Sequence, residues 1–157
     1  MTFDFTGLYE FHGHKCPMST MGARLGLAAM EALGVGKPDQ FSIEGRFFAK
    51  NCALDGIQYV TGCTLGNGNL SFEDSGRAVF VLGMKGGGSE VTVAISDEAL
   101  VRFAAHKSNK AGLLEEREIS GLPRAMEIDG LISRDFEVLI EWVQTAPSEA
   151  LVVVTGN

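Results

Sequence analysis

The chain has 157 residues, of which 45% are hydrophobic and 21% are charged, and its formal net charge is −7 at pH 7. This length and composition are typical of one globular domain, so we expect residues 1–157 to form a single domain. The negative charge argues against a nucleic-acid partner, because the phosphate backbone attracts basic surfaces.

Several features that the sequence lacks indicate where the protein works. It has no apolar run long enough to span a membrane, and its N-terminus has neither the basic start nor the apolar core of a secretion signal. Its three cysteines are too few, and odd in number, for a disulfide framework. We therefore expect a cytoplasmic protein with no membrane partner, whose cysteines are free thiols.

Three side chains that can bind a metal ion lie close together near the N-terminus, at His12, His14 and Cys16. Neutral imidazole and thiolate are ligands that zinc prefers, so these residue types predict a Zn²⁺ site. Alternate residues of an extended segment point to the same side. We therefore expect the three side chains to face one ion.

The first predicted helix covers residues 17–33, because proline is favoured at its first position and Gly34 provides a stop. Cys16 would then lie at the amino end of this helix. Free N–H groups and the helix dipole favour a thiolate there, so we expect the pKa of Cys16 to fall. Gly22 and Gly26 would let another backbone approach the helix closely.

The next predicted elements are a strand over residues 41–47 and a helix over residues 51–62. Cys52 begins this helix, and Cys63 follows its end. A straight helix of that length spans about 16 Å, so the two sulfurs cannot both bind one ion. Either thiol could join Cys16, and the helix dipole gives only a weak preference for Cys52.

The rest of the chain contains both strand and helix patterns. Strands are predicted over 77–84, 90–95 and 151–154, and helices over 97–106 and 133–145, while the polar residues 107–118 favour no element. Because helices and strands are mixed without strict alternation, we predict an α+β fold with a mixed sheet.

Ordered motifs occupy the first half of the chain: FHGHKCP at residues 11–17, Gly22-Ala23-Arg24, CALDGIQ at 52–58, TGCTLGNGNL at 61–70, and Asp74-Ser75-Gly76-Arg77-Ala78. Together they resemble the E-subunit family of formylmethanofuran dehydrogenase. The resemblance implies a thioredoxin-like core, with a mixed sheet of about five strands flanked by helices, in an intertwined homodimer.

The same resemblance implies an active site that can hold zinc. Carried over by motif, its positions are His12, His14, Cys16, Cys52, Asp55 and Cys63. Relatives are associated with a molybdenum or tungsten enzyme, whose subunits are therefore expected partners.

The chain departs from the family pattern at two points. Met18 stands where glycine usually follows the Cys-Pro pair, and a larger side chain there would narrow the site. No cysteine follows Cys63, so we do not expect the C-terminal zinc finger of longer relatives.

Three functional hypotheses follow. The first is a zinc protein in which Cys16 is a catalytic ligand, Asp55 orients a ligand or carries a proton, and Arg24 holds an anionic substrate. The second is a thiol redox protein in which Cys16 attacks a disulfide that Cys52 or Cys63 resolves. The third is a non-catalytic accessory or metal-delivery subunit. The substrate, the reaction and the completion of the site by a second chain stay open.

Overall fold

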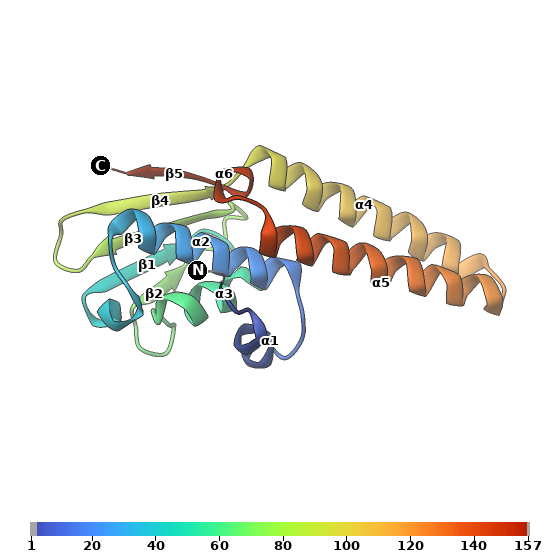
Figure 1. Cartoon of the computed structure of the whole chain (residues 1–157), viewed down its shortest axis with the longest axis horizontal. Helices are drawn as coiled ribbons and strands as arrows, with labels where there is room; N and C mark the ends of the chain where they lie inside the picture. The colour runs from blue at the N-terminus through green and yellow to red at the C-terminus, as the bar shows by residue number, and fades with distance from the viewer. Residues whose placement is uncertain (1–2, 157) are drawn as a thin grey trace.

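The computed structural model describes residues 3–156 and contains a five-stranded mixed sheet with helices packed on one face (Figure 1). The strand order is β2-β1-β3-β4-β5. β1 and β2 are parallel, and the other neighbours are antiparallel. The strands are β1 Ile43–Phe47, β2 Leu70–Phe72, β3 Val79–Met84, β4 Glu90–Ile95 and β5 Val152–Gly156. The predicted α+β fold with a mixed sheet is confirmed, and its likeness to thioredoxin stays a prediction.

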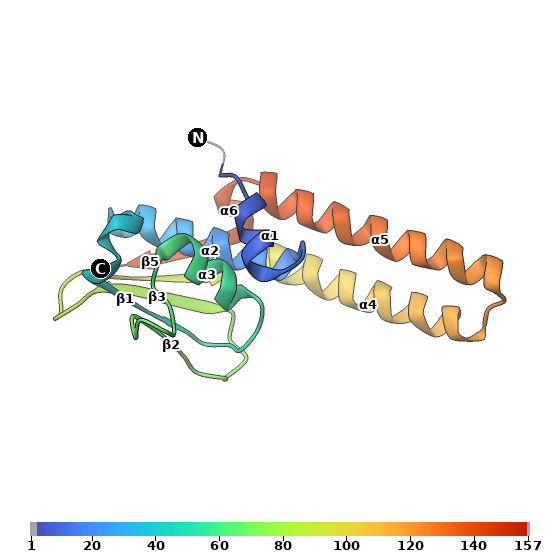
Figure 2. The same cartoon turned by 90° about the horizontal axis from the view of Figure 1, so that it is seen from below.

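The helices form a layer on the sheet and an arm beside it. They are α1 Thr6–His12, α2 Pro17–Leu33, the 3₁₀ helix η1 Lys37–Phe41, α3 Ala53–Thr61, α4 Asp97–Ile119, α5 Leu122–Thr145 and α6 Ser148–Leu151. α2 and α3 lie side by side on the sheet, whereas α4 and α5 form a long hairpin that projects beyond it (Figures 1 and 2).

The two faces of the sheet differ because side chains alternate along each strand. In β1, Ile43, Gly45 and Phe47 are buried toward the helices, and Glu44 and Arg46 are exposed on the opposite face. The main core lies between α2, α3 and the sheet, and also includes residues at the sheet-proximal ends of the hairpin. One face of the sheet is therefore covered by helices, and the other carries charged side chains.

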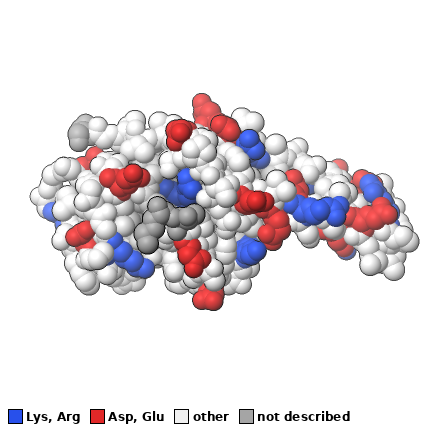
Figure 3. Space-filling model, in the orientation of Figure 1, with Lys and Arg blue, Asp and Glu red and all other residues white. Residues whose placement is uncertain are grey.

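The hairpin explains the largest errors of the sequence-based boundaries. The helix predicted over 97–106 continues through the polar residues to Ile119, and the helix predicted from Ser133 begins at Leu122. Each helix packs against its partner on one side only, and its exposed side carries charged side chains as well as apolar ones such as Val101 and Ile119. Ion pairs such as Arg117–Asp129 and Arg124–Glu116 lie along the hairpin, whose surface has both basic and acidic side chains (Figure 3).

Arg24 binds the carboxyl end of α5, a structural role that the sequence did not predict. Its guanidinium donates hydrogen bonds to the carbonyl oxygens of Gln144 (3.0 Å) and Ala146 (2.7 Å), at the carboxyl end of α5. Burial lowers the pKa of Arg24. Arg24 therefore caps a helix and ties α5 to α2, so an anion-holding role is no longer needed to explain it.

The helices of residues 3–156 differ from membrane spans. None of them combines the length and the apolar character that crossing a bilayer requires.

Candidate metal centre

Cys16 and Cys52 each occupy the N-cap position of a helix, of α2 and α3 respectively. The two helices cross at glycines with almost no space between their backbones. A Cβ atom added at Gly22 would lie 2.0 Å from the carbonyl oxygen of Ala53, and one added at Gly56 would lie 2.0 Å from that of Ser19. This contact brings the amino ends of the helices together. The close approach predicted at Gly22 is confirmed, but the sequence did not single out Gly56.

His12 reaches the site in a different way from the one predicted. It is the last residue of α1, and Gly13 then turns the chain with a φ of +91°. The expected extended run of His12, His14 and Cys16 is therefore wrong, because a helix and a left-handed glycine interrupt it. What aligns His12 with Cys16 is the packing of α1 against α2 and α3.

A chain of hydrogen bonds holds α1 in this place. The side-chain amide of Gln144 donates to the Tyr9 hydroxyl (2.8 Å), which contacts the Thr20 hydroxyl (2.8 Å). Thr20 in turn donates to the carbonyl oxygen of Cys16 (2.8 Å). Because Thr20 uses its own proton on Cys16, Tyr9 is the donor to Thr20. α1, α2 and α5 are thus linked to the backbone of Cys16.

The imidazole of His12 is oriented by a carboxylate. Nδ1 of His12 lies 2.6 Å from Oδ2 of Asp55, a residue in the first turn of α3. A carboxylate accepts a hydrogen bond, so Nδ1 carries a proton, and in the neutral imidazole the lone pair lies on Nε2. The side chain of His12 is only 8% exposed. Asp55 therefore has the contact expected of an orienting residue.

One nitrogen and two sulfurs converge at the amino ends of α2 and α3. The potential ligand atoms of His12, Cys16 and Cys52 all lie within 4.8 Å of one another. Within residues 3–156, Nε2 of His12 is a buried side-chain atom with no hydrogen-bond partner. Such a lone pair is costly unless it has a partner, and a cation is a suitable one. The donor set fits zinc, which favours nitrogen and sulfur.

The two other predicted ligands lie differently. The exposed ring of His14 has its centre 4.5 Å from that of His12, so it borders the cluster without belonging to it. Cys63 is fully buried at the far end of α3, where its thiol contacts the carbonyl oxygen of Ile43 at 3.8 Å. The structure thus brings Cys52, and not Cys63, to Cys16. Met18 packs against the main core.

The environment of Cys52 disfavours its charged form. Burial raises the pKa of the Cys52 thiol, and the neighbouring Cys16 and the Asp55 carboxylate raise it further. Burial also raises the pKa of Cys63, against smaller opposite effects of Thr61 and Lys85. Cys52 therefore keeps its proton at neutral pH unless a cation compensates the thiolate.

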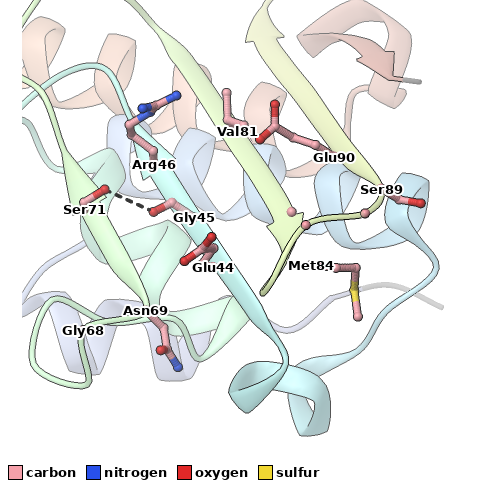
Figure 4. A pocket seen from close by; sticks show the side chains of 13 residues that line it. Glu44, Gly45, Arg46, Gly68, Asn69, Ser71, Val81, Met84, Ser89 and Glu90 are labelled. Carbon is pink, nitrogen blue, oxygen red and sulfur yellow. Dashed lines mark hydrogen bonds between the residues drawn. The ribbon is translucent and has the colours of Figure 1, made fainter.

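A polar cavity of about 370 Å³ lies on the open face of the sheet (Figure 4). Gly83 pairs with Glu44 on one side and Glu90 on the other, and its missing side chain leaves space between these carboxylates. None of the five predicted metal ligands lines this cavity. It is a feature separate from the thiol cluster.

The fold and this cluster define an α+β protein in which an imidazole and two helix-capping thiols surround one point. The family model described as "FmdE, Molybdenum formylmethanofuran dehydrogenase operon" matches residues 11–153. The chain therefore belongs to the FmdE family, which confirms the resemblance seen in its motifs. The family description links such proteins to formylmethanofuran dehydrogenase operons.

Two relatives extend this comparison. A "Probable S-adenosyl-L-methionine-binding protein" of Archaeoglobus fulgidus is 36% identical over 98 residues, which are 60% of this chain and 27% of the relative. The chain thus spans about a quarter of the relative it matches. The crystal structure of a tungsten formylmethanofuran dehydrogenase FmdE-like protein from Syntrophus aciditrophicus matches with a TM-score of 0.62 at 19% identity, over 98% of this chain and 69% of that one. This second likeness concerns the fold.

Proposed function

We propose that the protein binds one zinc ion per chain through Nε2 of His12 and the sulfurs of Cys16 and Cys52. The observation that carries the proposal is the buried, unpartnered Nε2 beside two thiols. Three protein ligands leave one position of a tetrahedral ion for water or a substrate, which is typical of catalytic zinc sites. His14, whose ring centre lies 4.5 Å from that of His12, is a further imidazole beside the site.

The chain's own residues define what the site can do. A bound zinc ion supplies Lewis acidity to the group that occupies the open position. Asp55 holds the His12 ring with Nε2 toward the thiols, and its side chain is 38% exposed. Asp55 can therefore exchange a proton with solvent while it orients the ligand.

We further propose that the protein works in the cytoplasm, forms a homodimer, and associates with a molybdenum or tungsten enzyme. Family membership supports the enzyme association. The projecting hairpin supports a protein partner, because it exposes apolar side chains that a second copy or another protein would cover; they include Val101, Ile119, Leu122, Met126 and Val138. An accessory or metal-delivery subunit would use the same surfaces but bind the metal weakly and show no turnover.

A thiol redox function is the second candidate, and the proximity of Cys16 and Cys52 favours it over any pairing with Cys63. The Cys16 thiolate would attack a disulfide of a partner, releasing one partner sulfur as a thiolate. Cys52 would then attack the mixed disulfide and release the second one. The chain ends as a Cys16–Cys52 disulfide and the partner as a dithiol, so electrons balance. Oxidation that links these cysteines equally well with and without zinc would favour this candidate.

Zinc titration at several pH values tests the main proposal. Because the pKa of Cys52 is raised, protons compete with zinc for its sulfur at neutral pH. We expect one ion per chain, proton release on binding, and an affinity that rises from about pH 6 and continues to rise above about pH 8.5, because the raised pKa of Cys52 keeps protons in competition there. Chelator competition measures the affinity and calorimetry in two buffers measures the protons. An affinity independent of pH would exclude thiolate ligands.

Replacing Asp55 by asparagine tests its orienting role. We expect Asp55→Asn to weaken zinc binding by about 10- to 100-fold, because the His12 ring loses its carboxylate partner. Asp135→Asn is a matched control, since Asp135 lies 2.6 Å from Nδ1 of His106 in the hairpin. This substitution also removes a carboxylate from an imidazole, but it does so far from the thiols. Equal zinc affinities of the two variants would contradict an orienting role for Asp55.

A further inference from the structure

Two arginine side chains lie against one phenylalanine on the open face of the sheet. The guanidinium carbon of Arg77 lies 4.4 Å from the centre of the Phe48 ring, and that of Arg46 lies 5.0 Å from it. The ring is 9% exposed, whereas both arginines are exposed. Phe48 thus holds two cations at the surface in defined positions.

A lysine lies at the same end of the sheet as the two arginines, but not on the same face. The ammonium nitrogen of Lys50 lies 6.0 Å from the ring centre of Phe72 in β2, a ring that is 38% exposed. Lys50 stands two residues before Cys52 in the segment between β1 and α3. Because Phe72 pairs with Phe47, whose side chain faces the helices, Lys50 lies on the helix side of this end of the sheet, whereas the two arginines lie on the open face.

The Asp74-Ser75-Gly76-Arg77-Ala78 motif, which the metal centre does not use, positions Arg77. The backbone N–H of Arg77 and the hydroxyl of Ser75 both donate to the carbonyl oxygen of Phe48, at 2.9 Å and 3.0 Å. Gly76 between them has a φ of +72°, in the region that favours glycine. The turn thus fixes the arginine against the ring.

No carboxylate of residues 3–156 forms an ion pair with Arg46, Lys50 or Arg77. The guanidinium of Arg46 stays apart from the carboxylates of Glu44 and Glu90 in Figure 4. Apart from a long contact of 3.4 Å between Arg77 and Ser75, the guanidinium N–H groups of both arginines have no protein acceptor in the described chain. This is notable in a protein of net charge −7, in which the hairpin arginines Arg117 and Arg124 are paired.

We propose that Arg46 and Arg77 bind an anionic ligand that carries phosphate or carboxylate groups. The guanidinium fork matches the geometry of such oxyanions, and free N–H groups provide the donors. Because the Phe48 ring and the turn already hold the two guanidinium groups, less conformational entropy is lost on binding. The site lies outside the thiol cluster and needs no metal.

Calorimetric titration of the metal-free and the zinc-loaded chain with inorganic pyrophosphate and with succinate tests this site. We expect Arg46→Gln and Arg77→Gln each to weaken binding of the preferred probe by about tenfold or more, because a charge-assisted hydrogen bond is lost. The probe that binds more tightly identifies phosphate or carboxylate as the recognised group.

Two further variants make the result specific. Arg134→Gln removes the same charge from an arginine without an ion pair on the hairpin, and we expect it to bind the probe as the wild type does. Arg77→Lys keeps the charge and loses the fork, so its affinity should lie between those of the wild type and Arg77→Gln. Circular dichroism confirms that each variant is folded. No binding of either probe by the wild type, or equal binding by all variants, would overturn the proposal, whatever the zinc titration shows.

Discussion

Replacing Cys16 or Cys52 by serine is expected to weaken zinc binding by roughly a hundredfold or more, because each thiolate supplies a large share of the binding free energy of a zinc site. A serine hydroxyl is a harder donor and keeps its proton at neutral pH. The loss should be similar for the two variants, since both sulfurs belong to the same cluster. Chelator competition at fixed pH measures it.

Cys63→Ala is the control for this pair. Cys63 is fully buried at the other end of α3, outside the cluster. Its truncation leaves a small cavity and should lower the free energy of unfolding, while the zinc affinity of the folded chain stays unchanged. If Cys63→Ala lost zinc affinity as strongly as Cys52→Ser, the assignment of ligands would be wrong.

Introducing a methyl group at the helix crossing is expected to damage both stability and metal binding. In Gly56→Ala the new Cβ would lie 2.0 Å from the carbonyl oxygen of Ser19 and 2.4 Å from the backbone nitrogen of Ala23. These are backbone atoms of α2, so the helices must separate. Overpacking of this kind costs about 1–3 kcal/mol of unfolding free energy. Because the same contact sets the distance between Cys16 and Cys52, zinc affinity should fall with it.

A matched glycine lies in α4. A Cβ added at Gly112 meets no atom within 4 Å. Gly112→Ala should therefore raise the unfolding free energy by about 0.5–1 kcal/mol, as alanine does within a helix, without changing zinc binding. Urea denaturation of both variants measures the free energy of unfolding, and zinc titration measures the affinity. A Gly56→Ala chain with wild-type stability and wild-type zinc affinity would show that the crossing does not position the thiols.

Local patterns in the sequence predicted an element correctly where strong signals mark its beginning and its end. The helix predicted from Pro17 to Leu33 is confirmed at both ends, because proline starts it and Gly34, with a φ of +72°, stops it. β4 was equally clear, since apolar residues alternate along it and glycines precede it. The bounds of the hairpin helices were harder to predict, because a helix that packs against only one neighbour has a narrow apolar stripe.

The sequence by itself determined the family, the α+β class and the residue types of the candidate site, because these depend on composition, on local periodicity and on motifs. Only the tertiary structure decided which residues meet. His12 ends a helix, Cys52 and Cys63 lie at opposite ends of α3, and two glycines bring α2 and α3 into backbone contact. Such contacts join residues about 30 to 40 positions apart and depend on how helices pack, which no local pattern encodes.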